Sequence, residues 1–436
     1  MNDGSKQVWL VLSHGFNMDG RAASQTITDK IPHLLKLGVE PVVVSAITGK
    51  KDKVVEHHQV LPAGPVALRF DLRHYLKQRI SSRAIYRIAM TAISLLLLPF
   101  ILIEKLFTRI ETHWSWAITA YFTGARIIRN RKPELVYSTG GAYSAHLAGY
   151  WLKLRYGLPW IAEIHDPMIL DTQPKNARVH FSGWLEGIIC KHADVVWWFT
   201  EEAWARARAR HPELGERGHC LIPGSNPPEF IRAPYQHNKH LVFGHFGSLA
   251  DTRNLEFFLL GLRRVLEKNP HWEEHFRLQI YGGGLDAVSA RALRDFPRPS
   301  MIERFGRLET DPKTGESGRD QVLKRMNAVD CLLLLHGTIP VCEEYIPSKM
   351  YEYLWTQRPI LALVWHNPQM ERILRELGHW AVKADDADSV ASALEELHAR
   401  WMRDDLADSG VPSAYTSEAA TRQIIAWADE SLNRSI

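Results

Sequence analysis

The sequence predicts a two-domain α/β protein in which each domain is built around a parallel β-sheet. Its 436 residues exceed what a single hydrophobic core normally organises. Patterns of buried strand, glycine-containing loop and helix alternate through both halves, as is typical of parallel sheets with helical crossovers. The Pro- and Gly-rich segment 221–228 is typical of a linker. We therefore expect one domain at residues 1–220, a second at 221–412, and a helix within 413–436.

The first half begins as a strand–loop–helix–strand unit. Residues 7–13 form an apolar run typical of a buried strand, and the loop after them contains Gly15, Asp19 and Gly20. A single helical pattern then ends at Gly38, and a second strand is expected at 41–46. Glycines after a first strand suit a phosphate or a closely approaching acceptor, and they are also ordinary turn residues.

Three further strands are expected in this half, at residues 135–139, 159–164 and 195–199. The first leads into Gly140 and Gly141, and the second ends in His165 and Asp166. Thr200 follows the third strand and is expected to cap a helix.

The second half repeats the same alternation. Strands are expected at 241–246, 276–281, 302–306, 330–335 and 359–364. Helices are expected at 254–267 and at 417–432, the latter at the end of the chain.

Composition indicates an ordinary globular chain with an uneven charge distribution. Hydrophobic residues make up 45% and charged residues 23%. Four cysteines without framework spacing, and no signal peptide, favour a reducing cytoplasm. The net charge of +4 divides unequally, because residues 1–217 hold 28 Lys and Arg against 19 Asp and Glu. We expect this basic half to meet an anionic partner.

Residues 88–103 lack any charged side chain. As a helix these sixteen residues would span about 24 Å, short of the roughly 30 Å hydrocarbon core of a bilayer, and Pro99 is expected to kink them. A basic stripe precedes them, so we expect an insertion at about 69–110 that dips into one leaflet of an anionic membrane. A buried core helix and a true transmembrane span are the alternatives, and an apolar run has no role in nucleic-acid binding. The expected membrane-facing residues are Arg79, Arg83, Arg87, Leu95, Leu96, Leu97, Leu98 and Phe100.

The segment 342–354, CEEYIPSKMYEYL, carries the strongest functional signal. It places Glu344 and Glu352 eight positions apart, and Ser348 is expected to cap a helix that begins at Lys349. Lys349 and Glu352 then share one helical face. Two carboxylates that accept hydroxyl hydrogen bonds, with a lysine at a positive helix end, suit a sugar joined to a nucleotide by a diphosphate.

This pattern resembles the E-x7-E signature of retaining GT-B glycosyltransferases of the family 4 type. The family's motif order is also matched by Ala193-Asp-Val-Val, Phe246-Gly-Ser-Leu, Gly306-Arg-Leu and Pro347-Ser-Lys. The resemblance implies two Rossmann-like domains facing a central cleft, and a C-terminal helix that crosses back to the first domain. It implies that Glu344 contacts the transferred sugar and that Glu352 holds the ribose. Such enzymes act in bacterial cell-surface glycan assembly.

The remaining candidate residues concern the leaving diphosphate and the acceptor. Gly247, Ser248 and Arg253 form the loop before a helix, where Arg253 is expected to bind phosphate with Lys349 and the Ser348 helix start. Relatives carry Arg where Ser248 stands, so this chain departs from the family there. With two cations on the diphosphate and no Asp-x-Asp motif, we expect no metal and no cofactor.

His165 matches the histidine that the family places near the transferred sugar, with Asp166 beside it to orient His165 or the acceptor.

We therefore predict a metal-independent glycosyltransferase on the cytoplasmic face of the inner membrane. Its donor is a nucleotide diphosphate sugar and its acceptor is a lipid-linked, polyprenyl-diphosphate type saccharide, in polysaccharide, O-antigen or exopolysaccharide biosynthesis. A soluble GT-B epimerase or phosphorylase, and a non-catalytic nucleotide-sugar-binding subunit of a glycan assembly complex, are the alternatives.

Overall fold

The chain divides into two compact units in the computed structural model, which describes residues 7–18, 21–108, 113–140, 143–170, 172–173, 176–228, 234–406 and 413–434. The N-terminal unit comprises Met1–Gly224 together with Ser417–Ile436, and the C-terminal unit comprises Ser225–Thr416. The division at Gly224 falls inside the segment 221–228 that the sequence indicates as a linker.

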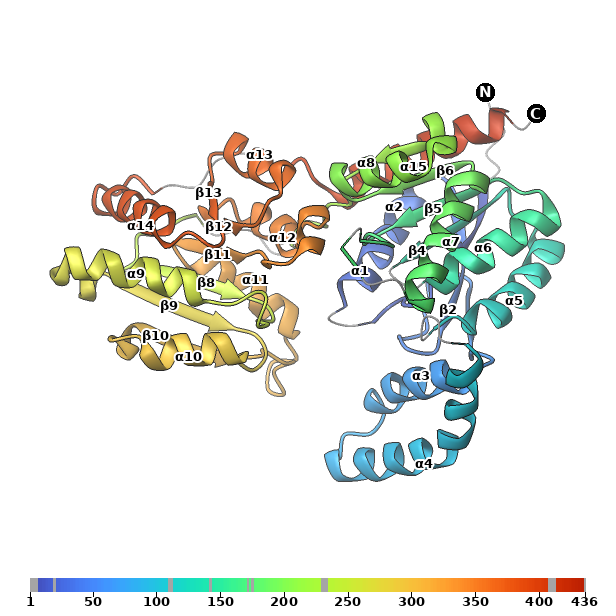
Figure 1. The fold of residues 1–436 in the computed structure, drawn as a ribbon, viewed down its shortest axis with the longest axis horizontal. Helices are drawn as coiled ribbons and strands as arrows, with labels where there is room; N and C mark the ends of the chain where they lie inside the picture. Colours follow the sequence, from blue (N-terminus) through green and yellow to red (C-terminus); the bar gives the residue numbers. More distant parts are fainter. Residues whose placement is uncertain are drawn as a thin grey trace. The chain divides into compact units, whose positions relative to one another are not determined.

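The N-terminal unit is a parallel sheet covered by helices on both faces (Figure 1). Its strands lie in the order β3-β2-β1-β4-β5-β6-β7, so the direction of winding reverses between β1 and β4. One core cluster packs α5, α6 and α7 on the sheet, and another packs α1, α2 and α15 on the opposite face. The strands are β1 (Gln7–Leu12), β2 (Val39–Ala46), β3 (His57–Val60), β4 (Leu135–Gly140), β5 (Trp160–Ile164), β6 (Val195–Trp198) and β7 (Gly218–Cys220). The helices are α1 (Ala22–Thr28), α2 (Ile31–Lys36), α5 (Trp116–Arg131), α6 (Tyr143–Tyr156), α7 (Ala177–His192), α8 (Glu201–Arg210), the 3₁₀ turn η1 (Pro212–Arg217) and α15 (Ser417–Arg434).

The sequence predicted a single helix ending at Gly38, and this prediction is wrong because the structure has two helices in that segment. The chain leaves α1 at Thr28 and starts α2 at Ile31. Pro32 lies in the first turn of α2, where its missing N–H is tolerated, whereas the interior of one continuous helix would lose a hydrogen bond. The break turns the Lys30 side chain into the protein, where it is 1% exposed.

Helices α3 (Pro65–Lys77) and α4 (Arg83–Phe107) form a hairpin beside this sheet, and α4 is the outer of the two (Figure 1). Arg69 Nε donates to Ser94 Oγ at 2.8 Å, which joins the middles of the two helices. Glu104, near the end of α4, accepts from Val66 N–H at 2.9 Å and from the Trp114 indole at 3.0 Å. Glu104 therefore fastens the end of α4 to the start of α3 and to the segment before α5.

Helix α4 continues through Pro99 for 25 residues, longer than the sequence predicts. At 1.5 Å per residue its path along the helix axis is about 37 Å. By length and composition it is the one helix in the described parts of the chain that could cross a membrane. Only 6% of its most apolar window is buried, so the alternative of a buried core helix is wrong. Its exposed side chains include Leu95, Leu96, Leu98 and Phe100.

The C-terminal unit has a second parallel sheet, in the order β10-β9-β8-β11-β12-β13, whose winding reverses between β8 and β11. Its apolar core joins α9 and α14 to the sheet. The strands are β8 (Leu241–Phe246), β9 (Phe276–Tyr281), β10 (Ile302–Gly306), β11 (Cys331–Leu335), β12 (Ile360–Val364) and β13 (Trp380–Lys383). The helices are α9 (Glu256–Lys268), α10 (Ala287–Asp295), α11 (Gly318–Ala328), α12 (Lys349–Thr356), α13 (Pro368–Glu376) and α14 (Ala387–Met402), with 3₁₀ turns η2 (Pro270–Glu274), η3 (Pro299–Met301) and η4 (Pro340–Glu344).

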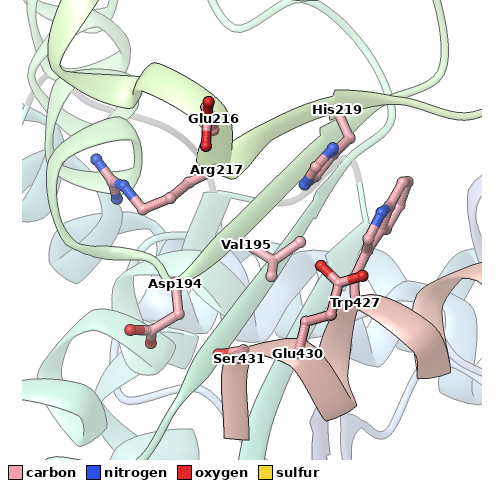
Figure 2. Close-up of a pocket in the computed structure, with 8 residues that line it drawn as sticks. All are labelled: Asp194, Val195, Glu216, Arg217, His219, Trp427, Glu430 and Ser431. Carbon is pink, nitrogen blue, oxygen red and sulfur yellow. The ribbon is translucent and has the colours of Figure 1, made fainter. Parts of the chain in front are cut away.

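Helix α15 packs on the N-terminal unit beside a small pocket (Figure 2). Trp427 of α15 stacks on His219 with ring centroids 4.2 Å apart. The pocket has a volume of about 170 Å³, below the roughly 300–1,000 Å³ of most ligand sites. It lies at the start of β6, beside Asp194 and Val195, whereas ligands of parallel α/β sheets bind at the carboxyl ends of strands. We therefore assign it to helix packing rather than to the active site.

Candidate active site

The candidate donor site begins where β8 and β11 end, at the reversal point of the C-terminal sheet. Gly247 follows β8 with φ of +156°, and a Cβ on neighbouring Gly282 would lie 2.0 Å from the Gly247 carbonyl oxygen. Gly337 follows β11, where a Cβ would meet the Cys342 sulfur at 2.8 Å. Thr338 N–H donates to the Thr252 carbonyl at 2.8 Å, so the two loops are joined directly. Gly282 and Gly337 leave no room for a Cβ, whereas Gly247 favours glycine because of its positive φ.

His245 of β8 lies directly beneath this loop and is 4% exposed. Its Nδ1 faces the Leu333 carbonyl at 3.2 Å, while its buried Nε2 has no hydrogen-bond partner among the described residues. That Nε2 lies 4.0 Å from the place of a Cβ on Gly247. Burial lowers the pKa of His245 to about 4, and the cations of Arg253 and Lys349 push it the same way. His245 is therefore neutral at pH 7, and both cations lie near it.

Glu344 ends the turn η4 and is 1% exposed. Asn367, after β12, donates to three carbonyls of this turn, those of residues 342, 343 and 345, at 3.0–3.2 Å. His336, after β11, accepts from Trp365 N–H at 3.1 Å through Nδ1, so its Nε2–H donates to the Tyr345 carbonyl at 3.0 Å. The ends of two neighbouring strands thus fix the backbone that carries Glu344.

Glu352 and Lys349 pair on the first turns of α12, as the sequence predicts for an i,i+3 pair. The other Glu352 oxygen lies 3.5 Å from Arg319 of α11, a cation that the sequence analysis did not identify. Ser348 precedes the helix, but its backbone is already helical and its side chain accepts no capping hydrogen bond, so the predicted N-cap role is wrong. Tyr353 Oη accepts from Phe246 N–H at 3.0 Å and thereby fastens α12 to the end of β8.

Arg253 precedes α9, as predicted, although the helix starts at Glu256 rather than at the predicted residue 254, and Arg253 Nε donates to the Ser248 carbonyl at 3.2 Å. This hydrogen bond closes the loop that starts at Gly247. Arg253 lies in the loop that follows β8, and the Tyr353–Phe246 hydrogen bond holds α12, which carries Lys349, against the end of the same strand, so both predicted phosphate-binding cations belong to segments at one edge of the sheet. Two cations, glycine backbone and carboxylates are a donor set suited to a diphosphate and hydroxyl groups.

In the N-terminal unit, His165 follows β5 and is 8% exposed. Its Nε2 lies 2.8 Å from Glu163 Oε1 and 3.1 Å from Thr139 Oγ1. Hydrogen bonding to Glu163 places the ring proton on Nε2, so Nδ1 keeps its lone pair, and no hydrogen bond to that buried Nδ1 is found in the described residues. His165 can therefore accept a hydrogen bond from a substrate hydroxyl.

Glu163 is fully buried and also contacts Lys30 at 2.9 and 3.0 Å and the Tyr137 hydroxyl. Burial alone would raise the pKa of Glu163, but the Lys30 ammonium and His165 outweigh it and hold the pKa below its ordinary value. An ionised Glu163 steadies His165, whereas Asp166 is exposed. Glu163 therefore orients His165, and the predicted role of Asp166 toward the acceptor stays a prediction.

Sequence reasoning missed the Glu163–Lys30 pair, although one signal was present. A charged residue inside the apolar strand WIAEI must be buried, and a buried carboxylate needs a partner. Of the predicted loop residues, Gly15 follows β1 by three positions and Gly140 ends β4 with φ of +121°. Asp19, Gly20 and Gly141 lie outside the described residues.

Comparisons with solved structures identify the fold. Sucrose-phosphate synthase from Thermosynechococcus elongatus superimposes with a TM-score of 0.61 at 13% identity, over 98% of this chain and 99% of that one. A glycosyltransferase from Rickettsia africae gives 0.57 at 12% identity over 99% and 97%. A putative UDP-N-acetylglucosamine 2-epimerase from Listeria monocytogenes gives 0.52 at 11% identity over 98% and 97%. No protein-family model and no curated protein matches the sequence. The chain therefore has the GT-B fold, with two Rossmann-like domains.

Proposed function

We propose that the chain is a glycosyltransferase that moves a sugar from a nucleotide diphosphate donor to a lipid-linked saccharide of the polyprenyl-diphosphate type. The observation that supports this proposal is the placement of Arg253, Lys349 and Glu352 on the loop and the helix that are joined to the end of β8 in a GT-B chain. The reaction belongs to polysaccharide, O-antigen or exopolysaccharide assembly.

The donor diphosphate is neutralised by protein cations in this proposal. Arg253 and Lys349 balance the charge that develops on the leaving diphosphate, so no metal or cofactor is needed there. Neutral His245 adds no competing charge beneath the loop. Glu352 accepts hydrogen bonds from the ribose hydroxyls, and buried Glu344 positions the transferred sugar.

The transfer proceeds with retention of anomeric configuration. The acceptor hydroxyl oxygen bonds to the anomeric carbon on the face from which the diphosphate leaves, and the bond between that carbon and the diphosphate oxygen breaks. The acceptor proton passes to the departing diphosphate. Nδ1 of His165, held by Glu163, accepts a hydrogen bond from a sugar hydroxyl, and Asp166 lies next to it for the acceptor.

The acceptor is lipid-linked because the exposed apolar face of α4 suits a membrane surface. Leu96 is 73% exposed and Phe100 is 58% exposed, which is unfavourable in water. Helix α3 packs along α4 and carries exposed Arg69, Arg73 and Lys77, so hydrocarbon cannot surround the hairpin. A monotopic position, with α4 in the leaflet and α3 at anionic headgroups, satisfies both helices. We infer the cytoplasmic face of the inner membrane, consistent with four free cysteines.

The proposal is tested by incubating the purified full chain with UDP-, GDP-, ADP- and dTDP-sugars and membrane extracts containing lipid-linked saccharides. We expect release of free nucleoside diphosphate with one donor and a labelled lipid product. Glu352→Ala should lower that rate about tenfold to hundredfold, from the loss of charged hydrogen bonds. Glu267→Ala, which removes an exposed carboxylate of the same unit, is the matched control. Release by Glu352→Ala at the wild-type rate would refute the site assignment.

The second candidate is a nucleotide-sugar epimerase, which the similarity to the Listeria 2-epimerase favours. An epimerase changes the donor sugar without any acceptor, so donor incubated with protein alone distinguishes the two activities. Tight donor binding without any product would instead favour a non-catalytic subunit.

A further inference from the structure

Three side chains of the kinds that bind metal ions meet at the edge of the N-terminal sheet. His14 follows β1 by two residues, Asp71 belongs to α3, and His113 precedes α5. One ligand atom from each lies within 4.8 Å of the other two, and His14 Nε2 is 3.1 Å from Asp71 Oδ1. No sequence spacing indicates this cluster, because 57 residues separate His14 from Asp71 and 42 separate Asp71 from His113.

The polar atoms of the cluster are buried and lack hydrogen bonds. Asp71 is 0% exposed and His14 is 4% exposed. Among the described residues, no hydrogen bond is made by either Asp71 oxygen, by His14 Nε2 or by His113 Nδ1. A buried carboxylate without hydrogen bonds is strongly unfavourable, and the nearby His14 ring approaches only one of its oxygens. One cation between the three side chains would satisfy these atoms together.

The ligand types select the class of cation. Two imidazoles and one carboxylate suit first-row divalent transition metals, zinc above all, whereas calcium and magnesium prefer oxygen ligands only. Tetrahedral bonds of about 2.0–2.2 Å place ligand atoms roughly 3.4 Å apart. The most distant pair must therefore approach by little more than an ångström, which side-chain rotation provides.

The surroundings complete the site. His74 lies one turn after Asp71 on α3, and its buried Nε2 also lacks a hydrogen bond among the described residues. Phe70 packs against His113 with ring centroids 4.3 Å apart, and Trp116 packs edge-on against His14 at 5.4 Å. These rings pack against the two imidazoles and restrict their movement.

We propose that His14, Asp71 and His113 bind one zinc-class divalent cation, with a water as the fourth ligand. The cation joins the end of β1 to α3 and to the segment before α5, so it clamps both ends of the α3–α4 hairpin to the sheet. This site belongs to the N-terminal unit. It does not depend on the proposed glycosyl transfer, whose diphosphate is held by Arg253 and Lys349 in the C-terminal unit.

The first test is zinc binding by the untagged full chain. Protein stripped with a chelator and titrated with zinc should bind one equivalent in a calorimeter, and its melting temperature should rise. Cobalt in place of zinc should give the intense visible absorption of a four-coordinate site. No binding by the wild-type chain would overturn the proposal and leave a metal-free His14–Asp71 ion pair.

Variants then assign the ligands. Asp71→Asn and His113→Ala should each weaken zinc binding at least tenfold and abolish the cobalt spectrum, while circular dichroism shows that they fold. His180→Ala, an exposed histidine of the same unit, is the matched control and should bind like wild type. Unchanged affinity in folded Asp71→Asn would overturn the assignment. A variant that fails to fold leaves the wild-type titration as the deciding measurement.

Discussion

The buried pair of Lys30 and Glu163 gives the sharpest prediction about stability. Glu163→Gln keeps the shape of the side chain and removes its charge, which leaves the Lys30 ammonium buried at 1% exposure. The Coulomb attraction across 2.9 Å is about 6 kcal/mol at an effective dielectric constant of 20, and the cost of burying both charges offsets much of it. Loss of one partner of such a pair typically destabilises a protein by about 3–5 kcal/mol. We expect Glu163→Gln to lower the free energy of unfolding of the N-terminal unit by this amount.

Urea unfolding followed by tryptophan fluorescence measures this effect, because Lys30 lies 5.2 Å from the Trp197 ring. Glu163→Gln should shift the N-terminal transition and leave that of the C-terminal unit in place. The double variant with Lys30→Met should recover most of the stability, since it leaves no buried charge. Glu56→Gln, which removes a partly exposed partner of Arg131, should stay within about 1 kcal/mol of wild type.

Acid adds an independent check on the same pair. The folded-state pKa of Glu163 is lowered, so its stabilisation is fully present above the unfolded carboxyl pKa and is lost as pH falls through the folded value. The difference in unfolding free energy between wild type and Glu163→Gln should therefore shrink as the pH falls. A Glu163→Gln variant as stable as wild type at pH 7, or a double variant less stable than Glu163→Gln alone, would refute the reasoning.

Further predictions concern the membrane, pH and donor binding. Leu96→Glu and Phe100→Glu should each reduce flotation with anionic vesicles by at least fivefold, since each side chain contributes about 1–2 kcal/mol at its exposure; unchanged flotation would contradict the α4 assignment. The folded-state pKa values of His245 and His336 are about 4, below the ordinary value. The free energy of unfolding should therefore fall as pH drops from 6.5 to 4, by up to about 1.4 kcal/mol per pH unit for each group. Equal unfolding midpoints at pH 7 and 5 would exclude this pH dependence. Arg253→Ala should weaken nucleoside diphosphate binding at least tenfold by calorimetry, and equal affinity would remove it from the diphosphate site.

The sequence predicted the alternating strands well because buried parallel strands are short apolar runs between glycine turns. The strand 241–246 and the strand 276–281 coincide with β8 and β9. The break between α1 and α2 was missed because the apolar period continues across Pro32. The apolar run alone did not separate an exposed α4 from a core helix, and the basic stripe before it was the signal that favoured exposure.

Only part of the candidate site was predicted from the sequence, because only some of its contacts are local. Lys349 and Glu352 lie on one helical turn, so their pairing follows from local geometry. The contacts of Glu163 with Lys30 and of Glu352 with Arg319 join segments far apart in the sequence, and no spacing encodes them. The capping role of Ser348 failed because an N-cap needs extended backbone, and the chain is already helical there.

The packing of α15 has a consequence for biosynthesis. Ile424 and Ala428 complete a hydrophobic cluster whose other fully buried members run from Trp9 to Trp197. The 226 residues between Trp197 and Ile424 take roughly 10–45 s to translate at 5–20 residues per second. The N-terminal unit is thus synthesised first, but its hydrophobic core is completed last. During that interval its apolar sheet face is exposed to chaperones, and a nascent chain cut short before α15 leaves that face open for good.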